Sequence, residues 1–278
     1  IINLFKDYQF LLMSKKALKL VTPISHLFKN EVDAHSIEEF SDELEARERT
    51  ANLRFNNTTH YHIDFDLNLG LSNAQKDFLH QHVKNRDEIQ TLTFQLTRDT
   101  ENFTLSNGRF VPKGPFISEK EQLTRSKNSL NTIRDIVGTE RSIGIENNNY
   151  YQTGAYEIST SSVFINKVIK ELDCHLLLDI AHAKVTCKNK KINLYTYINE
   201  LTKDIQCKQM HLCRTNERIS EYGKETFDAH LVPEKEDIEE AISICKNLDI
   251  KYLTVEYYRE AKTLISSLKM IRELTNNE

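Results

Sequence analysis

The sequence predicts a single (β/α)8 barrel, the TIM-barrel architecture, and three observations lead to it. Short apolar runs rich in β-branched and aliphatic residues alternate with stretches of helical pattern, which is typical of a parallel sheet. The chain has 278 residues, close to the roughly 250 residues at which such barrels form one domain. Ionisable residues follow several of the apolar runs, where the active sites of these barrels gather.

The first third of the chain supplies three predicted strands with intervening helices. Residues 18–25 form the first strand, and the charged stretch 36–50 is predicted to be helical. Residues 60–70 alternate strictly between two kinds of side chain, as a strand with two different faces does. A helix over residues 72–83 and a third strand over residues 89–97 follow.

Turn and capping residues mark the next segment. The Asn-Gly and Gly-Pro steps within residues 98–116 indicate a hairpin or loop. Ser118 and Glu121 have the spacing of a capping box, so a helix begins there, and Gly138 ends it. Residues 142–146 form the next strand.

The rest of the chain continues the alternation. Helices are predicted over residues 160–172, 194–201, 234–248 and 261–274. Strands are predicted over residues 174–180, 208–213 and 251–257, and residues 227–231 form a short seventh strand or a loop. We expect residues 17–278 to be the barrel domain. Because Met13 precedes a segment that reads like a natural start, we expect residues 1–16 to be an N-terminal extension, disordered or loosely packed.

Composition limits the classes of function. Apolar residues make up 39% of the chain and charged residues 28%, so a sizeable core can form under a well-solvated surface. The net charge is -4 with no long run of one sign, which argues against a broad nucleic-acid-binding surface. Five cysteines without a CxxC pair fit a reducing compartment, so we expect a cytoplasmic protein. No segment approaches the roughly 18 apolar residues of a membrane span.

Seven residues with metal-binding side chains occur at or just past the ends of short runs in the second half of the chain. They are Glu146, Asp179, His182, His211, Asp228, His230 and Glu256. Such groups are costly to bury without a partner, and the ends of successive strands meet at one mouth of a barrel. Mixed oxygen and nitrogen ligation suits Fe, Mn or Zn. Seven ligands exceed what one ion takes from protein, so we expect two or three ions that share carboxylates.

The order of these residues resembles a known superfamily. From Glu146 to Glu256 the pattern E…D-x-x-H…H…D-x-H…E is similar to that of xylose-isomerase-like TIM barrels, which include endonuclease IV and many sugar isomerases and epimerases. The segments LLLDIAHAKVTCKN, YINEL, QMHLC, FDAHLVP and LTVEYY more closely resemble the multinuclear non-heme iron-dependent oxidases. Several of those enzymes modify cysteine residues in ribosomally made peptides. The resemblance covers residues 141–258.

This resemblance implies a function and further site residues. It implies that the seven residues hold two or three iron ions, with Zn or Mn taken up by isolated protein. It also implies an O2-dependent oxidase of a peptide or small thiol, and a small partner protein that presents the substrate. The additional early histidine ligand usual in the superfamily is His62, or His60 beside it. Asn147 and Arg214 lie beside ligands and are predicted to bind a substrate carboxylate or amide.

Two other classes of enzyme stay open. One is a sugar isomerase or epimerase with one Mn or Mg ion, in which Glu146 and Glu256 move a proton between adjacent carbons. The other is an endonuclease IV-like phosphodiester hydrolase that uses Zn. The acidic net charge counts against the hydrolase, as does Gln95, which stands where endonuclease IV has a further histidine. The isomerase leaves the pair Asp228 and His230 without a use.

Overall fold

Eight parallel strands form the centre of the protein. The structure, a computed structural model, describes residues 17–276, so the predicted extension lies outside the described residues. The strands are β1 (Lys19–Pro23), β2 (Glu43–Arg47), β3 (Thr58–Asp66), β4 (Thr91–Gln95), β7 (Ser142–Glu146), β8 (His175–Asp179), β9 (Cys207–Leu212) and β12 (Tyr252–Val255). They close in the order β1-β12-β9-β8-β7-β4-β3-β2. This is the single (β/α)8 barrel that the sequence predicts.

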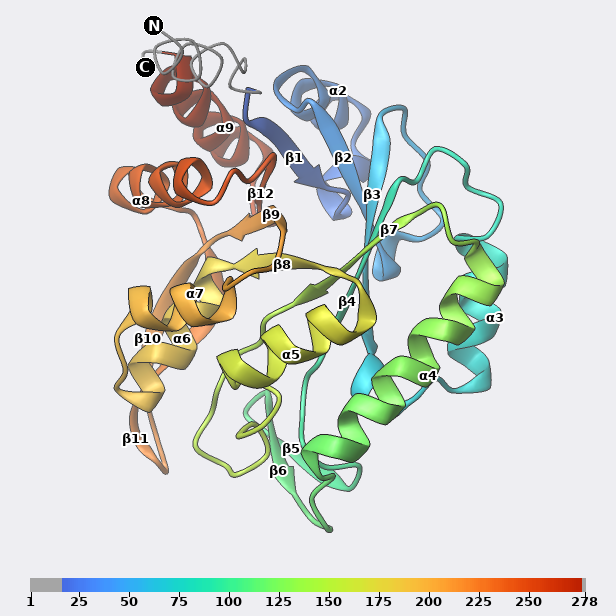
Figure 1. The fold of residues 1–278 in the computed structure, drawn as a ribbon. Coiled ribbons are helices and arrows are strands. Elements are labelled where there is room, and N and C mark those ends of the chain that lie inside the picture. The colour runs from blue at the N-terminus through green and yellow to red at the C-terminus, as the bar shows by residue number, and fades with distance from the viewer. Residues whose placement is uncertain (1–16, 277–278) are drawn as a thin grey trace, which may run out of the picture.

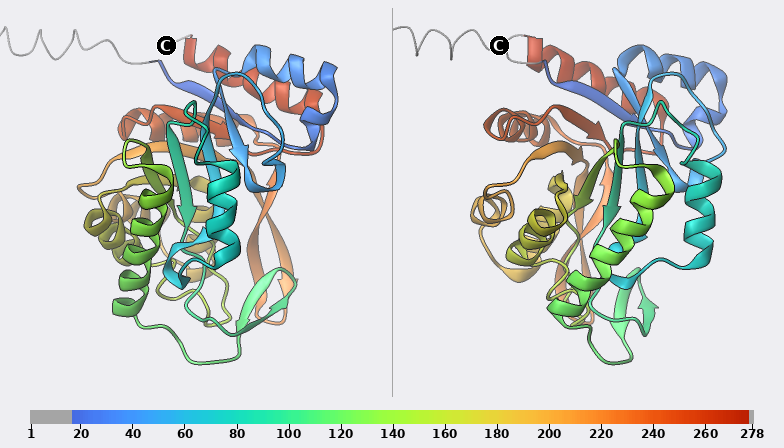
Figure 2. Two further views of the ribbon diagram at one scale, coloured as in Figure 1. Left: turned by 90° about the vertical axis from the view of Figure 1, so that its right-hand side faces the viewer. Right: turned by 45° about the vertical axis from the view of Figure 1, so that its right-hand side comes forward.

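Helices surround the strands (Figures 1 and 2). They are α2 (Glu31–Phe40), α3 (Asn73–His82), α4 (Glu119–Val137), α5 (Ser162–Leu172), α6 (Ile180–Lys190), α7 (Leu194–Leu201), α8 (Lys235–Asn247) and α9 (Ala261–Asn276). The last helix, α9, packs against the first described helix, α2, and so closes the ring. Short 3-10 turns follow three strands: η1 (His26–Lys29), η2 (Glu48–Thr50) and η3 (Leu67–Leu69). Within residues 17–276, no helix combines the length and the apolar character that crossing a bilayer requires.

Local capping decides where the long helix α4 begins and ends. The Ser118 side chain accepts a hydrogen bond from the Glu121 N–H, with Oγ and N 3.3 Å apart. Gly138 follows the last turn with a φ of 90°, a conformation that costs a residue with a Cβ considerably more. The predicted start and end of this helix are confirmed.

Two hairpins extend the barrel at the carboxyl ends of its strands. β5 (Phe103–Ser106) and β6 (Arg109–Pro112) meet at Asn107-Gly108, where both residues have positive φ, as the predicted Asn-Gly turn requires. β10 (Arg214–Ser220) and β11 (Gly223–Leu231) form the second hairpin after β9. In Figure 1 both hairpins point downward from the carboxyl ends of the barrel strands.

One barrel strand differs from the prediction. Residues 36–50 are not one helix, because α2 ends at Phe40 and residues 43–47 form strand β2. The stretch 227–231 is not a barrel strand, since it belongs to β11, which pairs antiparallel with β10. Strand β2 was not predicted because it directs charged side chains into the barrel, so it contains no apolar run. Helix α6, which follows β8 directly, was also not predicted.

The inside of the barrel is polar, and the apolar core lies between the strands and the helices. In β9, for example, Met210 and Leu212 belong to the apolar core, whereas Gln209 and His211 form polar contacts with other strands. At the amino-terminal end of the strands lies His175, whose Nδ1 is 3.1 Å from Ser142 Oγ. Burial lowers the pKa of His175 to about 3, and its other ring nitrogen has no hydrogen-bond partner.

The buried His175 predicts a loss of stability in mild acid. An unfolded histidine has a pKa of about 6.5, so between that value and about 3 the unfolded chain binds more protons than the folded protein. Stability therefore falls as the pH drops through this window, by about 2 kcal/mol at about pH 5. Urea unfolding of the wild type and of His175→Asn measures this, because other titrating groups cancel in the comparison. If the free energies of unfolding of the two proteins changed in parallel with pH, the lowered pKa of His175 would be refuted.

Candidate metal centre

The structure brings the seven predicted metal-binding residues to one end of the barrel. Four belong to the ends of barrel strands: Glu146 ends β7, Asp179 ends β8, His211 lies near the end of β9, and Glu256 follows β12. His182 lies in the first turn of α6, and Asp228 and His230 lie in β11 of the hairpin. Most of them line a cavity of about 930 Å³, which we call the mouth cavity. Asp179 and His211 are fully buried.

Asp179 and His182 form one unit because Asp179 caps helix α6. Its Oδ1 accepts a hydrogen bond from the His182 N–H at 2.7 Å. The His182 Nδ1 is 2.8 Å from the carbonyl oxygen of Asn147, which fixes the orientation of the ring. The His182 Nε2 is then 3.7 Å from Asp179 Oδ2 and 3.5 Å from Asp228 Oδ2. The buried Asp179 Oδ2 has no hydrogen-bond partner.

His211 joins the carboxylates on the other side of the mouth cavity. Its Nδ1 is 3.1 Å from Glu146 Oε1 and 3.3 Å from Glu256 Oε1. Its Nε2 is 3.1 Å from Oε2 of Glu45, a residue of β2. One histidine therefore contacts three carboxylates in the interior of the barrel.

The Asp228-x-His230 pair comes from the hairpin rather than from the barrel. Its two residues do not lie on one face of a regular extended strand, because His230 has a φ of 43°. This left-handed backbone is costly for a residue with a side chain. It leaves His230 Nδ1 3.3 Å from Asp228 Oδ2 and His230 Nε2 3.5 Å from Glu256 Oε2. Cys213 donates to Asp228 Oδ1, with Sγ and Oδ1 3.2 Å apart.

His62 also faces this site, whereas His60 does not. The His62 Nε2 is 3.6 Å from Glu146 Oε2, and its Nδ1 is 2.9 Å from Thr93 Oγ1. The carboxamide of Gln95 donates to Glu146 Oε2 at 2.9 Å and lies 3.2 Å from His62 Nε2. His60 lies lower in the barrel, where its Nε2 is 3.0 Å from Glu43 Oε2.

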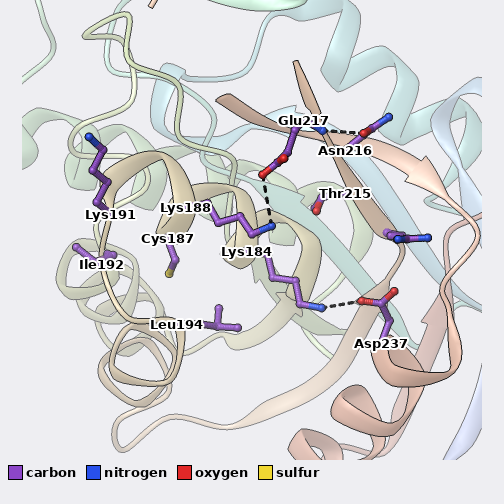
Figure 3. A pocket seen from close by; sticks show the side chains of 11 residues that line it. Lys184, Cys187, Lys188, Lys191, Ile192, Leu194, Thr215, Asn216, Glu217 and Asp237 are labelled. Atoms are coloured by element: carbon purple, nitrogen blue, oxygen red, sulfur yellow. Dashed lines mark hydrogen bonds and ion pairs between the residues drawn. The ribbon is translucent and has the colours of Figure 1, made fainter. Parts of the chain in front are cut away.

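Asn147 and Arg214 make other contacts. The Asn147 carboxamide bonds to the backbone N–H and C=O of Asp179, both at 2.9 Å, and so holds the end of β8. Arg214 pairs with Glu234 and lines a second cavity of about 650 Å³ between α6 and β10. Figure 3 shows that cavity, with Lys184 turned toward Asp237. The substrate-binding role of Asn147 and Arg214 stays a prediction.

Two residues of the site were missed because β2 was predicted to be helical. Glu45 is fully buried and accepts a hydrogen bond from Gln209 Nε2 at 2.5 Å, in addition to its contact with His211. Arg47 pairs with both Glu45 and Glu256. The alternation E-L-E-A-R was the available signal, since a period of two favours a strand whatever the chemistry of its inner face.

The charges of this site call for a cation. Burial raises the pKa of Asp179 to about 7. Burial disfavours charged His182 and His211, but the surrounding carboxylates raise the pKa of both well above the usual value. Within residues 17–276, no lysine or arginine forms an ion pair with Glu146, Asp179 or Asp228. In the described chain, the cationic groups in ion-pair contact with these three carboxylates are therefore imidazoles.

The donor set fits divalent transition metals. Three groups of side chains have ligand atoms within 4.8 Å of one another: Glu45, His211 and Glu256; Glu146, Asp179 and His182; and Cys213, Asp228 and His230. Carboxylate and imidazole donors suit Fe, Mn and Zn. The unpartnered Asp179 Oδ2 also fits a metal site, because a buried carboxylate oxygen without a partner is costly unless a cation is bound.

Comparison with known proteins gives one family and one fold. A family model described as "RiPP precursor modification enzyme MbnB/TglH/ChrH" matches residues 65–245. No curated protein matches the chain. A D-tagatose 3-epimerase-like protein has 14% identity and a TM-score of 0.58, and the match covers 94% of this chain and 99% of that one.

Two other solved structures are similar to the same degree. D-psicose 3-epimerase from Clostridium cellulolyticum H10 has 11% identity and a TM-score of 0.58, with 94% of this chain and 99% of that one covered. A xylose isomerase domain-containing protein from Salmonella typhimurium LT2 has 10% identity and a TM-score of 0.58, with 95% and 98% covered. At these identities the likeness establishes the xylose-isomerase-like barrel fold and nothing finer.

The buried carboxylates predict that metal stabilises the protein. An ion at about 100 times its Kd contributes about 2.7 kcal/mol, which raises the Tm of a domain of this size by about 5–10 °C. Calorimetry of chelator-treated protein, with and without added Fe(II) under anaerobic conditions, measures this rise. Asp179→Asn should lose most of it, whereas Asp87→Asn, a change of an exposed carboxylate, should keep it. An equal Tm with and without metal would contradict the assignment.

Proposed function

The chain belongs to the family of the RiPP precursor modification enzymes MbnB/TglH/ChrH, and on this premise we propose that it is a metal-dependent, O2-using oxidase of a cysteine-containing peptide. We propose iron as the metal, and a small partner protein that presents the precursor. In the overall reaction the cysteine residue loses electrons and protons, and O2 accepts them and is reduced to water.

One observation carries this proposal: imidazoles and carboxylates from four barrel strands, a helix and a hairpin meet in or directly beneath one mouth cavity. Most of these residues lie inside the family match. We propose that Glu146, Asp179, His182, His211, Asp228, His230 and Glu256 hold the metal, with His62 beside them. When bound, iron supplies an open coordination position for a thiolate and the redox chemistry that uses O2.

The residues of the chain hold these ligands in place. The carbonyl of Asn147 fixes the His182 ring, and Thr93 fixes the His62 ring, so that each presents Nε2 to the mouth cavity. The Tyr258 hydroxyl donates to Glu256 Oε1 at 3.1 Å. Ligands restrained in this way need little rearrangement when metal binds.

The walls of the mouth cavity suit a peptide. Phe110, Tyr151 and Tyr156 supply aromatic surface against which a peptide can exclude water. Lys29 and Arg49 also line the cavity, and Arg49 lies near the carboxylates of Glu48 and Asp64. We expect these two cations to attract carboxylates of the precursor.

The runner-up is a sugar epimerase, because the similar solved structures include enzymes of that name. An epimerase that needs one ion and two acid–base carboxylates leaves the hairpin residues Asp228 and His230 without a role. Their contacts with His182 and Glu256 therefore favour a centre with more than one ion.

Oxygen consumption tests the function. Iron-loaded protein should consume O2 when given its cysteine-containing precursor, and the peptide should change in mass. Glu256→Ala removes a proposed ligand and should lower the rate by about 100-fold or more. The matched control is Glu239→Ala, on the outer face of α8, which should keep the wild-type rate. Conversion of a ketose by Mn-loaded protein without O2 would instead establish the epimerase, and cleavage of abasic DNA by the Zn form the hydrolase.

A further inference from the structure

Arg47 lies inside the set of candidate ligands. Its Nη2 is 2.5 Å from Glu45 Oε1, and the same nitrogen also pairs with Glu256 Oε1. The side chains of Glu45 and Glu256 are 0% and 4% exposed, and that of Arg47 is 16% exposed. The contact with Glu45 lacks the geometry of a directed hydrogen bond, so charge rather than direction holds it. A guanidinium therefore already pairs with two of the carboxylates and offsets one of their two negative charges.

This distinguishes one candidate metal group from the other two. The group of Glu45, His211 and Glu256 contains two carboxylates, and both are paired with Arg47. In the described chain, the group of Glu146, Asp179 and His182 has no such internal cation, and its Asp179 Oδ2 is unpartnered. The second group therefore leaves all of its carboxylate charge for the histidine and metal ions to offset, whereas the first group leaves only half of its charge.

Glu45 has a different use for its second oxygen. Glu45 Oε2 is 3.1 Å from His211 Nε2, on the opposite side of the ring from the nitrogen that faces Glu146 and Glu256. A carboxylate bonded to the far nitrogen of a histidine orients the ring and raises its basicity. Glu45 is thus a positioning residue for His211.

The net charge of the site agrees with two divalent ions. Five carboxylates whose side chains are at most 10% exposed surround it, namely Glu45, Glu146, Asp179, Asp228 and Glu256, and Arg47 supplies one positive charge. Asp64, near His62, is left out of this count because its side chain is 45% exposed to solvent. Four negative charges are left, and two divalent ions neutralise them. A third divalent ion would leave the buried site with two excess positive charges before any substrate binds, which is costly in a poorly solvated environment.

Gln95 lies between two other candidate ligands, Glu146 and His62. Its carboxamide nitrogen donates to Glu146 Oε2 at 2.9 Å and lies 3.2 Å from His62 Nε2. The region between β3, β4 and β7 therefore already has an internal hydrogen-bond donor between two of its potential ligands. This leaves the groups around Asp179, His182 and the hairpin, where no amide or guanidinium of the described chain lies between the ligand atoms, as the better places for ions.

We propose that Arg47 is a built-in cation that takes the place of a third metal ion, so that the centre holds two ions, with Glu45 outside their ligand sets. This inference rests on the proposed metal-dependent function. It assigns Glu256 a double role, with Oε1 paired to Arg47 and Oε2 directed toward His230 and the ions.

Counting iron tests the inference. Full-length protein is loaded anaerobically with excess Fe(II) and freed of unbound metal, and iron is measured per folded chain. The wild type should hold two ions. Arg47→Met removes the charge and the guanidinium but keeps an unbranched side chain, so Glu45 and Glu256 should take up a third ion, a 1.5-fold increase. Arg47→Lys, which keeps the charge, should stay at two.

A second variant guards against misfolding of Arg47→Met. Glu45→Gln should keep both ions, because Glu45 is not a ligand. Three ions in the wild type, two ions in folded Arg47→Met, or loss of iron from Glu45→Gln would each overturn the inference. The count needs neither peptide nor O2. A protein that holds two irons but does not oxidise a peptide would therefore refute the proposed function and leave the role of Arg47 standing.

Discussion

Uncompensated negative charge at the mouth of the barrel is the constraint on which the rest of this structure depends. Glu45, Glu146, Asp179 and Glu256 are all at most 3% exposed, in a region where an unpaired carboxylate is strongly destabilising. The fold tolerates them because histidines, Arg47 and, as we propose, metal ions lie between them. The parallel barrel supplies the arrangement, since all eight strands deliver their carboxyl ends to one edge.

A second set of residues keeps the charged groups apart and oriented. Asn147 clamps the backbone of Asp179 and also fixes the His182 ring, so one residue positions two candidate ligands. Thr93 and Glu45 do the same for His62 and His211. These contacts restrict each imidazole to one orientation, which favours a defined centre over a loose acidic pocket. The strained backbone at His230 belongs to the same pattern, because it turns that ring toward Glu256.

The sequence was sufficient for the barrel. Glu146 and Asp179 could be predicted at strand ends because an acidic residue directly after a buried run is conspicuous, and their role as ligands stays a prediction. Glu45 and Arg47 were not found, because β2 has charged residues on its inner face and its composition favours a helix. The turn at His230 also could not be predicted, since a positive φ outside glycine depends on tertiary contacts around the hairpin rather than on local sequence.

Anomalous diffraction at the iron absorption edge, from crystals grown and loaded without O2, tests the central claim most directly. We expect two anomalous peaks in the mouth cavity, close to Asp179, His182, Asp228 and His230, with Arg47 still between Glu45 and Glu256. No peak in the cavity would contradict the claim that metal compensates the buried carboxylates. A peak between Glu45 and Glu256, with Arg47 turned away, would contradict the assignment of Arg47 as the internal cation.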